Sequence, residues 1–160
     1  MADLLRKAHV MTRSPEDTAA MARHLAPCLR AGDVILLIGE VGAGKTHFAR
    51  SLIAASLVSP EDIPSPTFTL VQTYAGQNGE IWHVDLYRLT DISEIEELGL
   101  LHAFTEAICL VEWPDRLGTL APEYALSITF DPGEEPEARE ITLDWCAPRW
   151  DGAMDGLHHD

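Results

Sequence analysis

A glycine-rich stretch contains the residues whose types and spacing point most directly to chemistry. It reads LIGEVGAGKTHFAR over residues 37–50, and Gly39, Gly44, Lys45 and Thr46 within it match the pattern GxxxxGK[ST]. In that pattern, glycines let successive backbone N–H groups converge on phosphate oxygens at a helix N-terminus, the lysine adds a positive charge beside the β- and γ-phosphates, and the hydroxyl can bind Mg²⁺. The expected nucleotide-binding residues of this stretch are Gly39, Glu40, Val41, Gly42, Ala43, Gly44, Lys45, Thr46 and His47.

The alternative for this stretch is a purely structural role, in which the glycines only end a strand. A lysine at the start of a helix opposes the helix dipole unless an anion compensates it, so the alternative leaves Lys45 unexplained. Guanine-specific loop NTPases of the GTPase kind rely on an NKxD element, and Lys7 and Lys45 are the only lysines of the chain. The sequence therefore favours ATP over GTP.

Two acidic residues stand at the ends of apolar segments, where they could serve phosphate chemistry. Hydrolysis on such a loop needs an acid that holds Mg²⁺, directly or through water, and a group that positions the attacking water. Asp85 ends the segment IWHVD and Glu112 ends the segment ICLVE. Both are candidate catalytic residues and, with Thr46, candidate metal ligands. Which acid takes which role stays open, and either could be an ordinary strand-end residue.

Three further residues have both a functional and a structural interpretation. Thr67 lies in the segment SPTF, where a loop could fold over the γ-phosphate as a switch does, although a proline turn would look the same. Trp113, which follows Glu112, could stack on adenine or close the edge of the core. His83 shares a strand face with Asp85, so it could support that residue or be a buried histidine without a chemical role.

The patterns around these residues predict an α/β domain with a mixed, partly parallel central sheet that includes antiparallel hairpins. The unbroken apolar runs VILLI and AICLVEW are typical of strands covered on both faces, whereas the turn GQNG joins two segments that should form a hairpin. The expected strands are 8–13, 34–38, 67–74, 81–88, 107–113, 125–130 and 139–145, and the expected helices are 15–30, 45–57 and 91–104.

Length and composition bound the organisation of the chain. The 160 residues, 46% of them hydrophobic, fit a single domain over residues 1–147. Residues 148–160 have too little periodic apolar content to predict order, so we expect a flexible tail. Three widely spaced cysteines argue against a disulfide framework or a zinc site. The lack of a leader or of a long apolar run predicts a cytoplasmic protein without membrane segments.

The formal charge of −15 bears on possible partners. A surface with 26 acidic and 11 basic residues should repel a bare phosphate backbone. If nucleic acid is involved, we therefore expect a partner protein to hold it.

The motifs GEVGAGKT, SPTFTLV, HVDLYRL, EELGL and LVEWPDRLG, in this order, resemble the TsaE family, also called YjeE. The resemblance extends from the helix after Ser14 to about Pro122, and HxDLYR with VEWP is more specific than the phosphate loop alone. It implies a three-layer P-loop NTPase fold that binds ATP and Mg²⁺. The residues that match the family's functional motifs are Lys45, Thr46, Thr67, Asp85, Glu112 and Trp113.

The same resemblance implies a function in tRNA modification. Family members are small bacterial ATPases of tRNA threonylcarbamoyladenosine synthesis that act with a TsaB–TsaD pair, whose TsaD member transfers the threonylcarbamoyl group to adenosine 37 of tRNA. This chain would meet tRNA only through those partners. Its ATPase activity should be weak alone and rise in the complex, since a locally held switch loop is mobile.

Two other functions fit the phosphate loop. One is a small-molecule kinase, but only Arg116 falls between Arg88 and Arg139, so an arginine-rich lid is missing. The other is an interaction module in which ATP sets a shape without meaningful turnover. The acids Asp85 and Glu112 favour chemistry over this last alternative.

Overall fold

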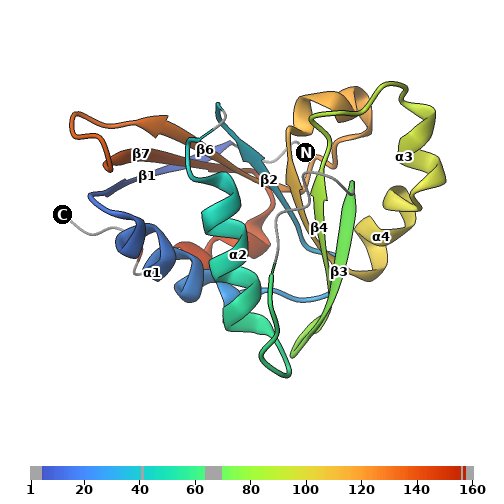
Figure 1. The fold of residues 1–160 in the computed structure, drawn as a ribbon, viewed down its shortest axis with the longest axis horizontal. Helices are drawn as coiled ribbons and strands as arrows, with labels where there is room; N and C mark the ends of the chain where they lie inside the picture. The colour runs from blue at the N-terminus through green and yellow to red at the C-terminus, as the bar shows by residue number, and fades with distance from the viewer. Residues whose placement is uncertain (1–4, 41, 64–69, 156, 158–160) are drawn as a thin grey trace.

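The computed structural model describes residues 5–40, 42–63, 70–155 and 157, which form a seven-stranded sheet flanked by helices (Figure 1). The strands are β1 (Arg6–Thr12), β2 (Val34–Ile38), β3 (Val71–Gly76), β4 (Gly79–Asp85), β5 (Ile108–Glu112), β6 (Leu126–Pro132) and β7 (Arg139–Trp145). The α-helices are α1 (Pro15–Leu25), α2 (Lys45–Ser56), α3 (Ser93–Glu97) and α4 (Leu100–Glu106). Short 3-10 segments are η1 (Ala26–Cys28), η3 (Pro114–Leu120), η4 (Pro148–Trp150) and η5 (Gly152–Met154).

The order of the strands places the ends of three of them side by side. The sheet runs β1-β7-β6-β2-β5-β4-β3, and the four strands β6, β2, β5 and β4 are parallel to one another. The pairs β3–β4 and β6–β7 are antiparallel hairpins, and β1 pairs antiparallel with β7. The mixed, partly parallel sheet predicted from the sequence is confirmed. Because parallel strands end at the same edge, the carboxyl ends of β2, β5 and β4 meet.

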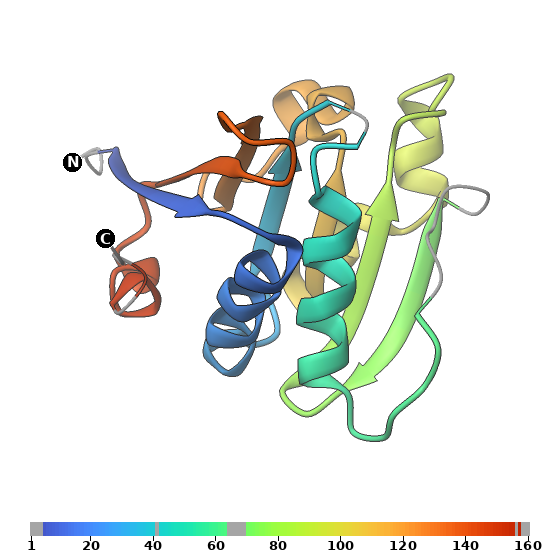
Figure 2. The same ribbon diagram turned by 60° about the vertical axis from the view of Figure 1, so that its left-hand side comes forward.

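Apolar layers cover both faces of the sheet, as the unbroken runs predict. In β2, Ile35 and Leu37 join the cluster that contains Phe48 and Leu52 of α2, while Val34 and Leu36 join the cluster of α3 and α4 on the other face. Figure 2 shows α1 and α2 next to each other on one face of the sheet. Helix, sheet and helix therefore form three layers. In the described residues, no helix has both the length and the apolar character needed to cross a membrane.

The first helix begins as predicted but ends earlier. The side chain of Ser14 accepts a hydrogen bond from the backbone N–H of Asp17, and Pro15 occupies the first turn, where its missing N–H costs nothing. The α-helix ends at Leu25 instead of near residue 30. Pro27 explains the early end, because proline lacks an N–H and clashes with the preceding helical turn.

The acidic segment expected as one helix over 91–104 forms two helices, α3 and α4. Gly99 separates them with φ of 74°, in the left-handed region that glycine adopts without strain. The strand expected over 81–88 also differs, since β4 ends at Asp85, whose carboxylate accepts the backbone N–H of Tyr87 and turns the chain. Residues 64–69, which include the start of the expected strand 67–74, lie outside the described residues.

The described part of the segment expected to be a flexible tail packs on the domain instead. Trp150 is fully buried and donates its indole N–H to the Tyr124 carbonyl, and Met154 and Leu157 are 3% exposed. Arg149 forms an ion pair with Asp33, at the start of β2. The sequence pattern failed here because two three-residue 3-10 turns leave no helical or strand periodicity.

Candidate functional site

The glycine-rich loop connects β2 to α2, as the motif requires. Gly39 has φ of 153°, and a Cβ atom at this position would lie 2.8 Å from the carbonyl oxygen of Phe130, so only glycine fits. Gly44, with φ of 106°, is the N-cap of α2 and offers no capping side chain. The first N–H groups of α2 have no acceptor within their own helix, so they can bind an anion from the pocket.

Lys45 lies buried in this loop with its charge incompletely compensated. Its side chain donates to the Gly39 carbonyl, and Nζ lies 3.6 Å from the centroid of the Trp113 ring. Among the described residues, no carboxylate lies within ion-pair distance of it. Burial lowers the pKa of Lys45, and the more distant charges of Glu112 and Asp85 oppose that shift. A bound phosphate would supply the anion that this ammonium lacks.

Glu112, at the end of β5, is held from two sides and is only 2% exposed. The Thr46 hydroxyl donates to its Oε1 at 2.8 Å, and His83 Nε2 lies 2.7 Å from its Oε2. An ionised carboxylate can only accept, so His83 donates through Nε2 in this arrangement. His83 therefore supports Glu112 and not its strand neighbour Asp85. Its other ring nitrogen, Nδ1, is buried and has no partner among the described residues.

Asp85 faces Glu112 across neighbouring strands, because the two are paired in the register of β4 and β5. Its Oδ1 accepts the backbone N–H of Tyr87 at 2.9 Å. Burial raises the pKa of Asp85, and the negative charge of Glu112 adds to that rise, whereas the Tyr87 N–H, His83 and Lys45 oppose it. Two acids thus face one pocket in different electrostatic settings.

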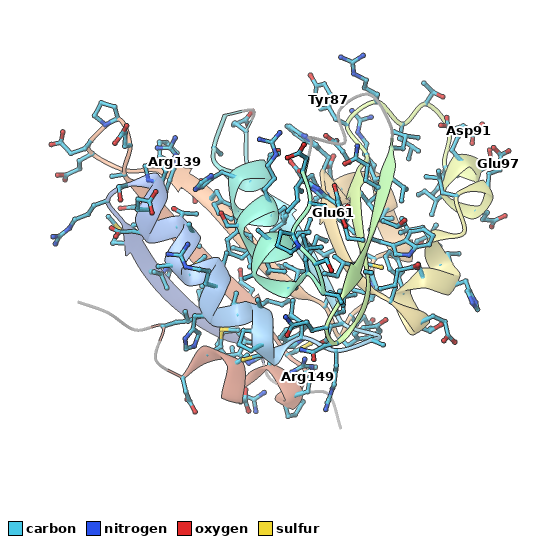
Figure 3. The ribbon with its side chains drawn as sticks, turned by 60° about the horizontal axis from the view of Figure 1, so that its bottom comes forward. Glu61, Tyr87, Asp91, Glu97, Arg139 and Arg149 are labelled. Atoms are coloured by element: carbon cyan, nitrogen blue, oxygen red, sulfur yellow. The ribbon has the colours of Figure 1, made fainter. Side chains whose placement is uncertain are left out.

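Trp113 adopts an unusual backbone conformation at the edge of this pocket. With φ of 59° and ψ of 52°, it is the one non-glycine residue of positive φ in the described part of the chain. A bulky residue that precedes a proline rarely adopts this left-handed conformation. Its ring contacts Tyr87, labelled in Figure 3, at 4.8 Å between centroids. Strain of this kind is frequent at functional sites. Trp113 also packs on the apolar cluster of α3 and α4, so it closes the edge of the core, and its stacking on adenine stays a prediction.

Two cavities meet at Trp113. One, of about 550 Å³, is lined by Gly42, Gly44, Lys45, Thr46, His47, Asp85, Tyr87, Arg88, Glu112 and Trp113. The other, of about 620 Å³, lies between the loop and the ends of β2 and β6, and mostly apolar side chains line it together with Glu40, Asp115 and Asp131. The first cavity suits phosphates and a metal ion, whereas the second suits a largely apolar group that carries hydrogen-bond donors.

The oxygen atoms beside the loop fit Mg²⁺ in part. The Thr46 hydroxyl and the Glu112 carboxylate lie together, and hard oxygen ligands are what Mg²⁺ prefers. No group of three or more His, Cys, Asp or Glu residues in the described part of the chain could hold a metal on its own. Phosphate and water oxygens would have to complete the coordination, which is the usual state of Mg²⁺ at nucleotides.

The structure thus brings together most of the residues predicted from the sequence. Lys45, Thr46, Asp85, Glu112 and Trp113 line one cavity with the glycines of the loop. His47 also lines it, while its ring contacts the Pro15 carbonyl of α1. Val41 and Thr67 lie outside the described residues.

Two residues that contact the site were missed or placed differently by sequence reasoning. His83 contacts Glu112, 29 positions away, and Arg139 contacts the carbonyls of Gly42 and Ala43, almost 100 positions away. Neither contact leaves a local signal in the sequence, because each depends on the order of strands in the sheet.

Comparisons with known proteins identify the family of the chain. The family model described as "Threonylcarbamoyl adenosine biosynthesis protein TsaE" matches residues 12–141. The chain is 36% identical to the tRNA threonylcarbamoyladenosine biosynthesis protein TsaE of Bacillus subtilis over 151 residues, which is 93% of each chain. It is 44% identical to the protein of the same name from Rickettsia conorii over 102 residues, or 64% of this chain and 58% of that one.

Some of the relatives are longer than the region that matches this chain. The match to TsaE of Rickettsia felis, at 42% identity, covers 62% of that protein, so the chain spans about three fifths of the length of the two Rickettsia relatives. Among solved structures, the crystal structure of Bacillus subtilis YdiB is similar with a TM-score of 0.77 and 27% identity. That similarity covers 96% of this chain and 95% of the other.

Proposed function

The chain belongs to the TsaE family, whose members take part in tRNA threonylcarbamoyladenosine biosynthesis, and we propose that it serves this process as a Mg²⁺-dependent P-loop ATPase. The observation that carries the proposal is the meeting of Lys45, Thr46, Asp85 and Glu112 around one cavity. A cation, a hydroxyl and two carboxylates are what phosphoryl chemistry on this type of loop requires. A purely structural loop would not need a buried acid, Glu112, and a half-buried acid, Asp85, beside it.

The two cavities divide a nucleotide between them. The phosphates would lie at the N-terminus of α2, against the open N–H groups and Lys45. The nucleoside would lie in the second cavity, where Asp115 and Asp131 could accept hydrogen bonds from N–H or O–H groups. Trp113, at the boundary of both cavities, would contact the nucleotide there.

Thr46 and Glu112 are the residues that would hold Mg²⁺, since their oxygens already lie within hydrogen-bonding distance of each other. The bound ion would neutralise charge on the β- and γ-phosphates. Lys45 would stabilise the same charge from the other side. His83 keeps the Glu112 carboxylate in place by donating to Oε2.

Asp85 would orient the attacking water in this division of roles. It lies one strand farther from the loop than Glu112, and its pKa is raised by burial and by Glu112. A carboxylate of raised pKa is a better acceptor of a water proton than an ordinary aspartate. Thr67, which lies outside the described residues, stays a proposed switch residue.

We further propose that the ATPase acts with TsaB and TsaD family proteins in the cytoplasm. The strongly negative surface is compatible with tRNA being held by those partners and not by this chain. Partner contact would hold the switch segment over the γ-phosphate and so raise a weak basal rate.

Phosphate release from ATP tests the proposed function. The wild-type chain should release phosphate slowly with Mg²⁺, faster with a purified TsaB–TsaD pair, and Lys45→Ala should abolish the stimulated rate. Small phosphate acceptors should not become phosphorylated, because transfer to an acceptor would indicate a kinase. Equal rates with and without the pair, or wild-type activity of Lys45→Ala, would contradict the proposal.

A further inference from the structure

Arg139, the first residue of β7, spans the space between a hairpin and the phosphate loop. Its Nε donates to the Ala43 carbonyl at 2.9 Å and its Nη2 to the Gly42 carbonyl at 3.2 Å. On the other side, Nη1 donates to the carbonyls of Pro136 and Ala138 in the β6–β7 turn. Figure 3 shows Arg139 beside the loop that leads into α2. One guanidinium thus ties the loop to the hairpin.

An ordinary surface ion pair does not explain this arginine. Within the described part of the chain, no carboxylate lies within 4.0 Å of its nitrogens, although acidic residues outnumber basic ones by 26 to 11. Within the described residues, Arg139 donates four hydrogen bonds, all to backbone carbonyls. Its positive charge therefore stays available to the phosphate loop, and its donors fix backbone geometry.

The β6–β7 hairpin holds the backbone of Arg139 within the central sheet. Arg139 pairs with Pro132 of β6 on one side and with Thr12 of β1 on the other, so its backbone is held within the sheet. The loop touches the same hairpin at a second point, because Gly39 lies against the backbone of Phe130. Both ends of the loop therefore depend on β6 and β7, which contribute none of the predicted catalytic residues.

The bond to Ala43 bears directly on phosphate binding. In a trans peptide the carbonyl and the following N–H point in opposite directions. Holding the Ala43 carbonyl against Arg139 therefore turns the Gly44 N–H away from the hairpin, toward the cavity of Lys45 and Thr46. We propose that Arg139 is a positioning residue that fixes the phosphate loop in its binding geometry through the carbonyls of Gly42 and Ala43. This inference rests on the proposed nucleotide binding and deepens it.

The test compares nucleotide affinity with stability in a set of arginine variants. Calorimetric titration with ADP and Mg²⁺ gives the affinity, and thermal unfolding without nucleotide gives Tm. Arg139→Ala should weaken ADP binding at least tenfold. Arg139→Lys should stay within about threefold of Arg139→Ala, because a lysine keeps the charge but lacks the planar fork that reaches two carbonyls.

Arg149→Ala is the matched control. Arg149 also binds a backbone carbonyl, that of Cys28, and pairs with Asp33 at the other end of the molecule from Arg139 (Figure 3). We expect this variant to lower Tm at least as much as Arg139→Ala does while keeping ADP affinity within twofold of the wild type. That split would separate positioning of the loop from general loss of stability.

Three results would overturn the inference. The first is wild-type ADP affinity in Arg139→Ala. The second is full recovery of affinity in Arg139→Lys, because that would leave only a charge effect. The third is a loss of affinity in Arg149→Ala as large as that in Arg139→Ala. If Arg139→Ala is unfolded at the assay temperature, the ADP affinity of the folded Arg139→Lys variant is the deciding measurement. Weak binding by that variant supports the inference, and wild-type binding overturns it. A wild-type chain that binds no ADP would instead overturn the proposed function itself.

Discussion

Glu112 illustrates how the candidate site depends on contacts between distant residues. Its two carboxylate oxygens bind Thr46 and His83, which lie 66 and 29 positions away in the sequence. A buried carboxylate is costly unless such partners satisfy it. The sequence predicted Glu112 as an acid at a strand end, but it could not predict the partners that fix its orientation and distinguish it from Asp85.

The roles of the two acids can be separated by substitution. Glu112→Gln should weaken binding of ADP with Mg²⁺ at least tenfold, because an amide is a poorer ligand for Mg²⁺ than a carboxylate. Asp85→Asn should keep that affinity within about threefold but lower partner-stimulated hydrolysis by about 100-fold, the usual size of a general-base contribution. Calorimetry and phosphate release measure the two effects. The opposite pattern would exchange the proposed roles.

The titration of Asp85 should reflect its surroundings. Burial, and next the charge of Glu112, raise its pKa from the ordinary 3.8, so the folded state binds this proton more tightly than the unfolded chain. The stabilising effect of the protonated form is complete below pH 3.8 and is lost as the pH rises through the raised pKa. Carboxyl ¹³C NMR should show one aspartate resonance, absent in Asp85→Asn, with a midpoint above 3.8. A midpoint at or below that value would be inconsistent with the half-buried position of Asp85.

At the scale of elements, sequence patterns predicted the regular segments well and the irregular ones poorly. Apolar runs and alternation predicted the strands 34–38 and 139–145 with the bounds that the structure has. Gly99 divided an expected helix, because its left-handed conformation has no periodic signature. The C-terminal segment was predicted as a flexible tail, yet its described residues pack through single side chains such as Trp150.

The phosphate loop should tolerate no side chain at its first glycine. Gly39→Ala would place a Cβ atom 2.8 Å from the Phe130 carbonyl oxygen at φ of 153°, so the loop must move. We expect at least a tenfold loss of ADP affinity by calorimetry. Gly152→Ala is the control, because a Cβ there meets no atom within 4 Å and φ lies outside the left-handed region. A Gly39→Ala variant of unchanged affinity would show that the loop is not braced against β6.

The C-terminal segment should contribute to stability. Trp150→Ala removes a fully buried ring and should lower the free energy of unfolding by about 3–5 kcal/mol. Val58→Ala truncates a side chain that is 64% exposed and should change it by less than about 0.5 kcal/mol. Urea unfolding followed by circular dichroism measures both values. Equal, small effects would mean that the segment does not pack on the domain in solution.

For the whole molecule, strand order decides whether the candidate residues meet. The motifs predicted a loop and two strand-end acids, but only the order β2-β5-β4 brings the ends of these three parallel strands side by side at one edge. That order depends on pairing between segments far apart in the sequence. The motif resemblance could supply the family and its expected fold, whereas the contacts of His83 and Arg139 required the structure.

The central claim is that the edge of the sheet where β2, β5 and β4 end binds the phosphates of a nucleotide. A calorimetric titration with ATP and Mg²⁺ tests this claim most directly. We expect the wild-type chain to bind one nucleotide per molecule. Lys45→Ala should weaken binding about 10- to 100-fold, since hydrogen bonds to charged groups contribute about 1.5–3 kcal/mol. A wild-type chain that releases no heat, or a Lys45→Ala variant that binds equally well, would contradict the claim.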